Sequence, residues 1–271
     1  MKEYLHHLTA AADNDLTRAL LAREYLQART LESLQDAGVF LQWAFLGGTA
    51  LRFLYNIPRF SEDLDFSLIT PGKDSGFQRA LAEVERALVF EGYRIEVKVS
   101  EKRTVASAWI RFPGLPHELG FSPRRSQNLS IRLELDTDPP EGAGIKTSIV
   151  RRHVTLNLCH HDRSSLLAGK LHAVLTRPWT KGRDLFDLAW YLADHTWPAP
   201  NLVLLNAALA QTDWDGPVLD SANWTVVLRG KLASLDWKRA QEDVRPFLEH
   251  PRDLALVSKE TLTQLLLPVG L

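Results

Sequence analysis

Hydrophobic and polar positions along the first 160 residues follow two different periods, which predicts helices and strands in mixed order. Apolar residues recur at helical spacing up to about residue 38, where Gly38 ends the region. Further helices are expected at 49–55 and 77–90. Strands are expected where apolar residues alternate with polar ones or form short runs, at 39–46, 64–68, 93–99, 105–112, 128–136 and 149–158.

The pattern changes near residue 160, and the later periodic segments are helical. They lie at 164–175, 185–192, 200–212, 222–234 and 256–267. The prediction is therefore an α+β protein with two domains. Residues 1–160 should form N-terminal helices and a mixed β-sheet flanked by helices, and residues 161–271 should form a helical domain.

Composition and charge narrow the class of protein only slightly. Hydrophobic residues make up 45% of the 271 residues and charged residues 24%, which suits a globular protein with a sizeable core. The net charge is -1, so any surface that binds nucleic acid must be local. The only cysteine is Cys159, which excludes an intrachain disulfide and fits a reducing cytoplasm. We expect no signal peptide and no membrane span, because no long apolar stretch occurs.

Two aspartates at the start of a predicted strand carry the clearest chemical signal. Asp63 and Asp65 flank Leu64, so the two-residue period of a strand places both carboxylates on one face. Neighbouring carboxylates repel each other unless a cation lies between them. Mg²⁺ or Mn²⁺ prefers such oxygen ligands and shares them with substrate phosphates. The pattern therefore predicts a metal site that binds a nucleoside triphosphate (NTP).

Residues just before the acid pair are candidates for phosphate contacts. Gly47, Gly48 and Thr49 join a predicted buried strand to a helix, where backbone N–H groups can approach a phosphate closely. Arg59 and Ser61 supply further donors. Asp-x-Asp alone is usually solvated surface and Gly-Gly alone is usually a turn, but their combination across a short helix favours a nucleotide site.

These residues resemble the opening motif of the AbiEii/AbiGii toxin family, which is nucleotidyltransferase-like and belongs to the DNA polymerase β-type superfamily. The stretches that carry the resemblance are Gly-Gly-Thr-Ala-Leu at 47–51 and Arg-Phe-Ser-Glu-Asp-Leu-Asp-Phe at 59–66. Three later motifs and the stretch 237–248 extend it over nearly the whole chain. The resemblance implies a nucleotidyltransferase domain followed by a helical domain that completes the active site.

A third carboxylate is expected from the strand at 128–136. Alternation places its apolar residues toward the core and turns Arg132, Glu134 and Asp136 outward. A two-metal transferase needs an acid from a neighbouring strand, which Glu134 or Asp136 can supply. The resemblance favours Glu134. A solvent-facing charged strand edge is the alternative.

Later helices supply a lysine and two aspartates. Lys170 lies in an apolar helical run, and the resemblance implies that it binds the triphosphate or neutralises the leaving pyrophosphate. Asp184 and Asp187 are three residues apart and share one helix face. Asp184 either caps the helix or has a catalytic or site-ordering role, and Asp187 is grouped with the nucleotide-binding residues.

Two groups of residues are set aside from the predicted site. A zinc site at Cys159, His160 and His161 is not expected, because tandem histidines at a strand end are mostly exposed. Three of the eight tryptophans, Trp179, Trp190 and Trp197, surround the fourth motif. Most should pack in the core and one is able to stack on a nucleobase, but the pattern does not distinguish them.

The resulting hypothesis is a metal-dependent nucleotidyltransferase that transfers a nucleoside monophosphate (NMP) from an NTP to an acceptor and releases pyrophosphate. The resemblance implies a toxin of a toxin–antitoxin or phage-defence system that acts on tRNA 3′ ends, with a cognate antitoxin as a partner. The alternatives are a protein NMP-transferase of the AMPylation type and a catalytically silent binding module. The pattern does not choose between ATP, GTP and CTP. The residues assigned to catalysis are Asp63, Asp65, Glu134, Asp136, Lys170 and Asp184, of which Asp63, Asp65 and Glu134 are the metal ligands.

Overall fold

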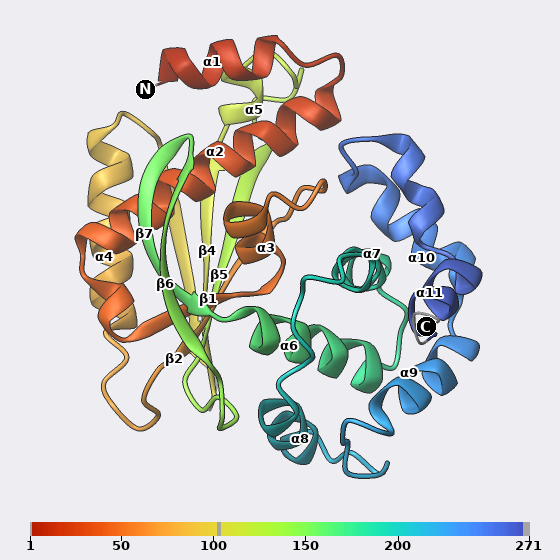
Figure 1. Ribbon diagram of the computed structural model, residues 1–271. Coiled ribbons are helices and arrows are strands. Elements are labelled where there is room, and N and C mark those ends of the chain that lie inside the picture. The colour runs from red at the N-terminus through yellow and green to blue at the C-terminus, as the bar shows by residue number, and fades with distance from the viewer. Residues whose placement is uncertain (1, 102–103, 268–271) are drawn as a thin grey trace. The chain divides into compact units, whose positions relative to one another are not determined.

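The computed structural model describes residues 2–101 and 104–267, and these form two compact units (Figure 1). The sheet unit runs up to Asn56 and contains 60–139 and 147–160. The helical unit contains 57–59, 140–146 and the chain from His161 onward. The main division thus falls after residue 160, and two short earlier segments pack with the helical unit, which a division into 1–160 and 161–271 does not describe.

A seven-stranded mixed sheet, in the order β3-β4-β5-β2-β1-β7-β6, confirms the predicted α+β class. β2 pairs in parallel with β5, and β1 pairs in parallel with β7, whereas β1–β2, β3–β4 and β4–β5 are antiparallel. The strands are β1 (Trp43–Leu46), β2 (Asp63–Leu68), β3 (Glu96–Glu101), β4 (Val105–Pro113), β5 (Asn128–Asp136), β6 (Ile145–Arg152) and β7 (Val154–His161).

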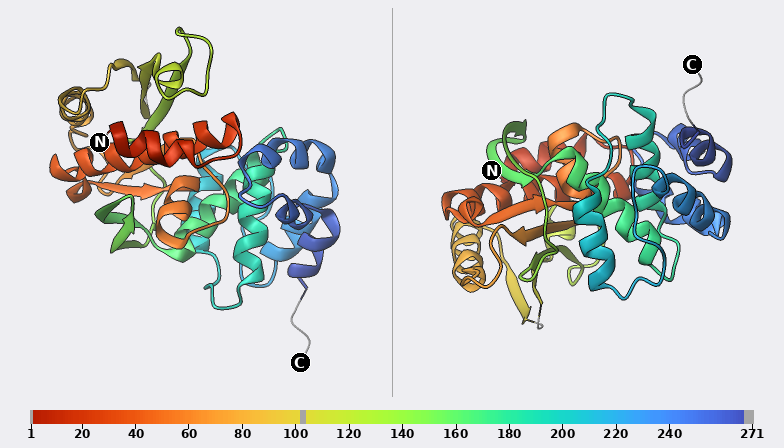
Figure 2. Two further views of the ribbon diagram at one scale, coloured as in Figure 1. Left: turned by 90° about the horizontal axis from the view of Figure 1, so that it is seen from above. Right: turned by 60° about the horizontal axis from the view of Figure 1, so that its bottom comes forward.

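Helices of the sheet unit pack on this sheet and on each other. α2 contacts β5 and α4, and α3 contacts β1 and β2 (Figure 1). Seen from above, α1 runs beside α2 (Figure 2). These helices are α1 (Lys2–Ala10), α2 (Asp15–Asp36), α3 (Gly47–Tyr55), α4 (Phe77–Phe90) and the short α5 (Leu115–Glu118).

The N-terminal region differs from the predicted single helical region and strand. The side chain of Asn14 accepts a hydrogen bond from the amide of Thr17 at 2.9 Å and begins a new helix, α2, after a break. The strand predicted at 39–46 is wrong in its first half. A 3₁₀ turn occupies Val39–Leu41, and the side chain of Leu41 is 86% exposed. Only Trp43–Leu46 joins the sheet.

A hairpin replaces the single strand predicted at 149–158. β6 ends at Arg152 and β7 begins at Val154, with His153 between them at φ 61°. At the end of β7, His160 and His161 are buried, so their predicted exposure is wrong. The ring Nε2 of His160 lies 2.9 Å from the hydroxyl of Ser148, a partner on the neighbouring strand that satisfies the buried imidazole.

A buried charged cluster explains why the hairpin turns at His153. Glu24 of α2 is 4% exposed and contacts Arg52 of α3 at 2.6 Å, Arg152 at 3.1 Å and His153 at 3.1 Å. Burial alone raises the pKa of Glu24, but the hydrogen bond from His153 and the charges of Arg52 and Arg152 outweigh it and lower that pKa to about 2. The cluster ties α2, α3 and the hairpin together.

The helical unit is built around α6, which contacts α7, α8 and α9 (Figures 1 and 2). α7 begins at Gly182, where an added Cβ would lie 1.7 Å from the carbonyl oxygen of Ala240, so α7 and α10 meet backbone to backbone. Its helices are α6 (Arg163–Thr176), α7 (Gly182–Ala193), α8 (Leu202–Gln211), α9 (Trp224–Ala233), α10 (Trp237–Val244) and α11 (Lys259–Leu265). No helix within 2–101 or 104–267 has the length and apolar character that a membrane crossing requires.

The Glu24 cluster predicts a specific pH dependence of stability. The folded-state pKa of Glu24 lies below the ordinary value of 4.5, so its stabilising contribution is full above that value and is lost as the pH falls toward about 2. Glu24→Gln removes the buried negative charge that pairs with Arg52. We expect it to lower the free energy of unfolding at pH 7 by roughly 3 kcal/mol. The deficit should shrink at pH 3, as measured by urea unfolding.

Glu85→Gln is the matched control, because Glu85 is an exposed carboxylate on α4. It should change the free energy of unfolding by less than about 0.5 kcal/mol at both pH values. An equal deficit for Glu24→Gln at pH 7 and pH 3 would show that the charge of Glu24 does not stabilise the fold.

Candidate active site

The strand face that carries the candidate acids is formed by β2 and β5. In their parallel pairing Asp65 lies opposite Glu134, and Asp63 lies opposite Arg132. Opposed residues of adjacent strands point to the same side of a sheet, so Asp63, Asp65 and Glu134 share one face. Leu64 is fully buried on the other face, which confirms the predicted orientation of the acid pair. We call this surface the acid face.

The start of α3 supports the acid pair. Gly47 has φ +78°, and an added Cβ would lie 2.3 Å from Oδ2 of Asp65, so only glycine fits beside this carboxylate. The hydroxyl of Thr49, fully buried like the neighbouring Gly48, donates a hydrogen bond to the carbonyl oxygen of Asp63. The hydroxyl of Thr49 thus anchors the first residue of β2 to α3, and the predicted contact of Thr49 with phosphate stays a prediction.

A glutamine outside the sequence motifs holds the loop before the acid pair. The amide Nε2 of Gln27 on α2 donates to the carbonyl oxygens of Ser61 at 3.3 Å and Glu62 at 2.9 Å. Gln27 is buried, whereas Ser61 is half-buried. The contact uses the backbone of Ser61, so its predicted hydroxyl contact with phosphate stays a prediction.

The register separates the two candidates for the third acid. Glu134 lies opposite Asp65, whereas Asp136 lies opposite Ser67, further along the strand. Asp136 accepts a hydrogen bond from the amide of Asp138 at 3.0 Å, and burial raises its pKa. Asp136 therefore shapes the turn after β5, and Glu134 is the acid nearest in register to the pair.

Glu134 is engaged by a cation. A guanidinium nitrogen of Arg132 lies 2.7 Å from Oε1 of Glu134, and the same guanidinium lies over the ring of Trp109 at 5.7 Å. Within 2–101 and 104–267, no three acidic, histidine or cysteine side chains converge as metal ligands do. The donor set nevertheless suits a hard cation, because it consists of carboxylates on one face with a glycine making room for one of them. Arg132 and a metal ion would therefore compete for Glu134.

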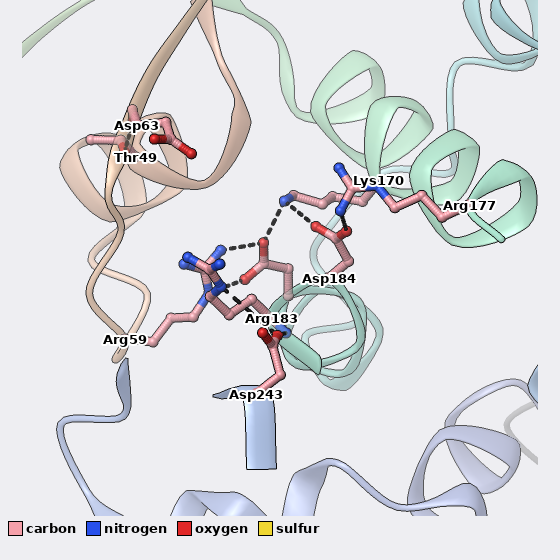
Figure 3. Close-up of polar contacts among 9 residues, drawn as sticks. Thr49, Arg59, Asp63, Lys170, Arg177, Arg183, Asp184 and Asp243 are labelled. Atoms are coloured by element: carbon pink, nitrogen blue, oxygen red, sulfur yellow. Dashed lines mark hydrogen bonds and ion pairs between the residues drawn. The ribbon is translucent and has the colours of Figure 1, made fainter. Parts of the chain in front are cut away.

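A second cluster lies within the helical unit and is centred on Lys170. Its ammonium Nζ lies 3.0 Å from Oδ1 of Asp184 and 2.7 Å from Oδ2 of Asp187. The other oxygen of Asp184 accepts a hydrogen bond from Arg177 at 2.6 Å. Figure 3 shows Lys170 and Arg177 pointing toward Asp184 from α6 and the end of that helix. We call these residues, together with Arg59, the lysine network.

Arg59 closes the lysine network from a segment far away in the sequence. Its guanidinium forms a two-pronged ion pair with Asp187, and the two side chains are 2% and 0% exposed. The backbone around Arg59 bridges to Leu248, and the amide of Glu249 donates to the carbonyl oxygen of Pro58 at 3.2 Å. Arg59 and Asp187 are thus buried against each other, and their predicted contact with nucleotide stays a prediction.

The charges of Lys170 and Asp184 are strongly stabilised. Burial alone raises the pKa of Asp184, but the positive charges of Lys170, Arg177 and Lys181 lower it to about 2. Burial alone lowers the pKa of Lys170, but Asp184 and Asp187 raise it above its ordinary value. A carboxylate with so low a pKa is a weak general base at neutral pH. The arrangement favours a site-ordering role for Asp184.

The alternative that Asp184 caps α7 is wrong. The cap position is Lys181, and its side chain makes no capping hydrogen bond. The first turn is held instead by Asp243 of α10, whose carboxylate accepts the amide of Arg183 at 3.2 Å (Figure 3). The guanidinium of Arg183 lies over the ring of Phe247 at 4.2 Å. Neither partner of α7 was identified from the sequence, because both lie more than fifty residues away along the chain.

Solved structures similar to this chain include those of two proteins. JHP933 from Helicobacter pylori is 17% identical with a TM-score of 0.53, and the match covers 91% of this chain and 90% of that chain. MenT4, a nucleotidyltransferase toxin from Mycobacterium tuberculosis H37Rv, is 17% identical with a TM-score of 0.52, covering 98% of this chain and 99% of that chain. At these identities the likeness shows the fold alone. No curated protein matches the chain.

The family comparison covers most of the sequence. The family model described as nucleotidyl transferase AbiEii toxin, type IV TA system, matches residues 29–259. This span contains the acid face and the whole lysine network. The chain therefore belongs to the AbiEii family of nucleotidyltransferase toxins of type IV toxin–antitoxin systems.

Proposed function

We propose that the protein transfers an NMP from an NTP to an RNA hydroxyl and releases pyrophosphate. The observation that carries the proposal is the acid face, where Asp63, Asp65 and Glu134 lie on one side of two adjacent strands. A face with three carboxylates needs a cation, and a metal-bound triphosphate supplies one together with the group to be transferred.

The acids would hold Mg²⁺ or Mn²⁺. The metal, when bound, would neutralise phosphate charge and lower the pKa of the attacking hydroxyl. Gly47 and Gly48 start α3, where free N–H groups suit phosphate oxygens. Ser61 adds a hydroxyl, and Lys170 supplies a fixed positive charge for the triphosphate. Thr49 acts by positioning Asp63.

The transfer is a single displacement at the α-phosphorus of the NTP. The acceptor oxygen bonds to the α-phosphorus, and the bond from that phosphorus to the bridging oxygen breaks, so pyrophosphate leaves with the bonding electron pair. The hydroxyl proton passes to a carboxylate of the acid face, for which Glu134 is the candidate. Lys170 compensates the negative charge that develops on the leaving group.

We further propose that the acceptor is the 3′ end of a tRNA and that the activity is toxic until a cognate antitoxin opposes it. Membership of the toxin family supports this view. NTPs and tRNA are both cytoplasmic molecules, so we expect the reaction to take place there. The alternatives are NMP transfer to a protein hydroxyl and a binding module without catalysis.

A labelling assay tests the proposed reaction. Purified protein is incubated with each of the four α-labelled NTPs and Mg²⁺, together with total tRNA or with cell lysate. We expect label in the tRNA band with one preferred NTP. Asp63→Ala should lower the rate by about 100-fold or more, because it removes a metal ligand needed in the transition state.

Asp13→Ala is the matched control, since Asp13 is an exposed aspartate between α1 and α2. It should label tRNA at the wild-type rate. Label confined to protein bands would instead support a protein NMP-transferase. An absence of labelled product with every NTP would contradict the enzyme and favour the binding module.

The ion pair between Arg132 and Glu134 should weaken the binding of metal to the acid face. Arg132 and a metal ion compete for the same carboxylate, so Arg132→Met should tighten Mn²⁺ binding. The effect should be about fivefold or less, because a partly exposed ion pair is worth no more than about 1 kcal/mol. Calorimetric titration with Mn²⁺ measures it. Arg111→Met, on neighbouring β4 opposite Ser130, controls for the loss of one positive charge, and equal affinities in both variants would exclude this competition.

We infer that Arg59 and Asp187 act by positioning Lys170. Removing Arg59 leaves the buried carboxylate of Asp187 to Lys170 alone, so Arg59→Met should lower the free energy of unfolding by roughly 3–5 kcal/mol. Arg59→Met with Asp187→Asn removes both charges and should recover part of that loss. Urea unfolding of the single and double variants gives the coupling energy.

The exposed pair Arg86–Glu83 on α4 provides the comparison. Arg86→Met should change the free energy of unfolding by less than about 1 kcal/mol. Additive losses in the Arg59 and Asp187 variants would show that the buried pair does not act as a unit. The KM for NTP should rise in Arg59→Met, since the ammonium of Lys170 is drawn to Asp187, whereas a purely structural pair would leave KM unchanged.

A further inference from the structure

Trp179 stands apart from the other two tryptophans near the fourth motif. It lies in the connection between α6 and α7, and 57% of it is exposed. Trp190 and Trp197 pack against each other at 5.2 Å, and Trp197 packs against Tyr191 at 4.3 Å. Of these three tryptophans, Trp179 is therefore the exposed one, and its ring is accessible to a ligand.

The surroundings of Trp179 combine apolar and charged groups. A shallow hollow beside it is lined by the aliphatic side chains of Val174, Leu185 and Leu235 and by the charged side chains of Arg177, Lys181 and Asp184. Single exposed apolar side chains are common on protein surfaces. An indole beside two cations is a more specific combination, because it suits a ligand with both a flat ring and a negative charge.

Positive charge is in excess at this hollow. Asp184 already forms ion pairs with Lys170 at 3.0 Å and with Arg177 at 2.6 Å. Within the part of the chain that the structure describes, the ammonium of Lys181 has no hydrogen bond or ion pair. Burial and the neighbouring cations lower the pKa of Lys181 despite the opposing effect of Asp184. An incoming anion would relieve this repulsion, so the hollow favours a negatively charged ligand.

We propose that Trp179, Arg177 and Lys181 form a nucleotide subsite, with a base stacked on the indole and a phosphate bound by the two cations. Stacking of a base on an aromatic side chain contributes about 1–3 kcal/mol, and it tolerates any base. Arg and Lys are the usual donors to phosphate. The inference rests on the proposed function for its ligand, since either the NTP or the end of the acceptor RNA supplies this chemistry.

Binding measurements without turnover test the subsite. The Kd of a fluorescein-labelled single-stranded RNA is measured by anisotropy, and the Kd of each NTP by calorimetry. Trp179→Ala should raise the Kd of one of these ligands by about 5- to 100-fold, as expected for the loss of one stacked base. Trp179→Phe should retain most of the affinity. Lys181→Ala should weaken the binding of the same ligand. For RNA, it should also reduce the salt dependence of the Kd by the amount expected for the loss of about one phosphate contact.

Two controls match the changes in charge and apolar surface. Lys238→Ala removes an exposed lysine from α10, and Val218→Ala removes exposed apolar surface from the connection between α8 and α9. Both should leave RNA and NTP affinity unchanged. A change in Lys238→Ala equal to that in Lys181→Ala would mean that only the net charge acts, which contradicts a built subsite.

The outcomes separate the ligand sources and the two proposals. Weaker RNA binding with unchanged NTP binding assigns the subsite to the acceptor, and the reverse assigns it to the NTP. If Trp179→Ala binds both ligands as the wild type does, or if the wild type binds neither, the subsite is overturned. Loss of binding in Trp179→Ala while the wild type transfers no NMP would instead contradict the proposed function and leave the subsite standing.

Discussion

The parallel pairing of β2 with β5 is the constraint on which the acid face depends. Leu64 and Leu133 lie opposite each other and are both fully buried, and the next pair, Phe66 and Leu135, is 2% and 0% exposed. Each such side chain contributes about 1.5–3 kcal/mol on burial. Two carboxylates a few ångströms apart in water repel by only about 1 kcal/mol. Hydrophobic burial therefore fixes the register, and the acids are brought together as a consequence.

Supporting contacts then limit how far the acids can move. Gly47 allows the carboxylate of Asp65 to lie against the start of α3, and Thr49 ties the backbone of Asp63 to the same helix. Gln27 holds the preceding loop from α2. These contacts use backbone atoms or glycine, so they position the acids without consuming the carboxylate oxygens. Glu134 in addition forms an ion pair with Arg132 at 2.7 Å.

Local periodicity predicted the elements that bury one face and could not predict contacts between distant residues. The bounds of α4 and β5 were predicted closely because their alternation of buried and exposed residues is regular. The turn at His153 was missed because its cause, Glu24, lies in a helix far away in the sequence. The pairing of Arg59 with Asp187 was not predicted for the same reason, since nothing near Arg59 along the chain indicates it. The motifs thus indicated the residues, and the tertiary structure adds contacts between them that the motifs do not show.

The acid face and the lysine network carry net charge of opposite sign. The acid face carries the carboxylates of Asp63, Asp65 and Glu134, a set of oxygen ligands that suits a positive ion. In the lysine network and beside it, the cations outnumber Asp184 and Asp187, so this surface favours a negative group. Burying charges in this way adds little to stability, because desolvation opposes the attraction within each pair. The proposed contact of Lys170 with a triphosphate would give its buried charge a role in binding, where stability supplies none.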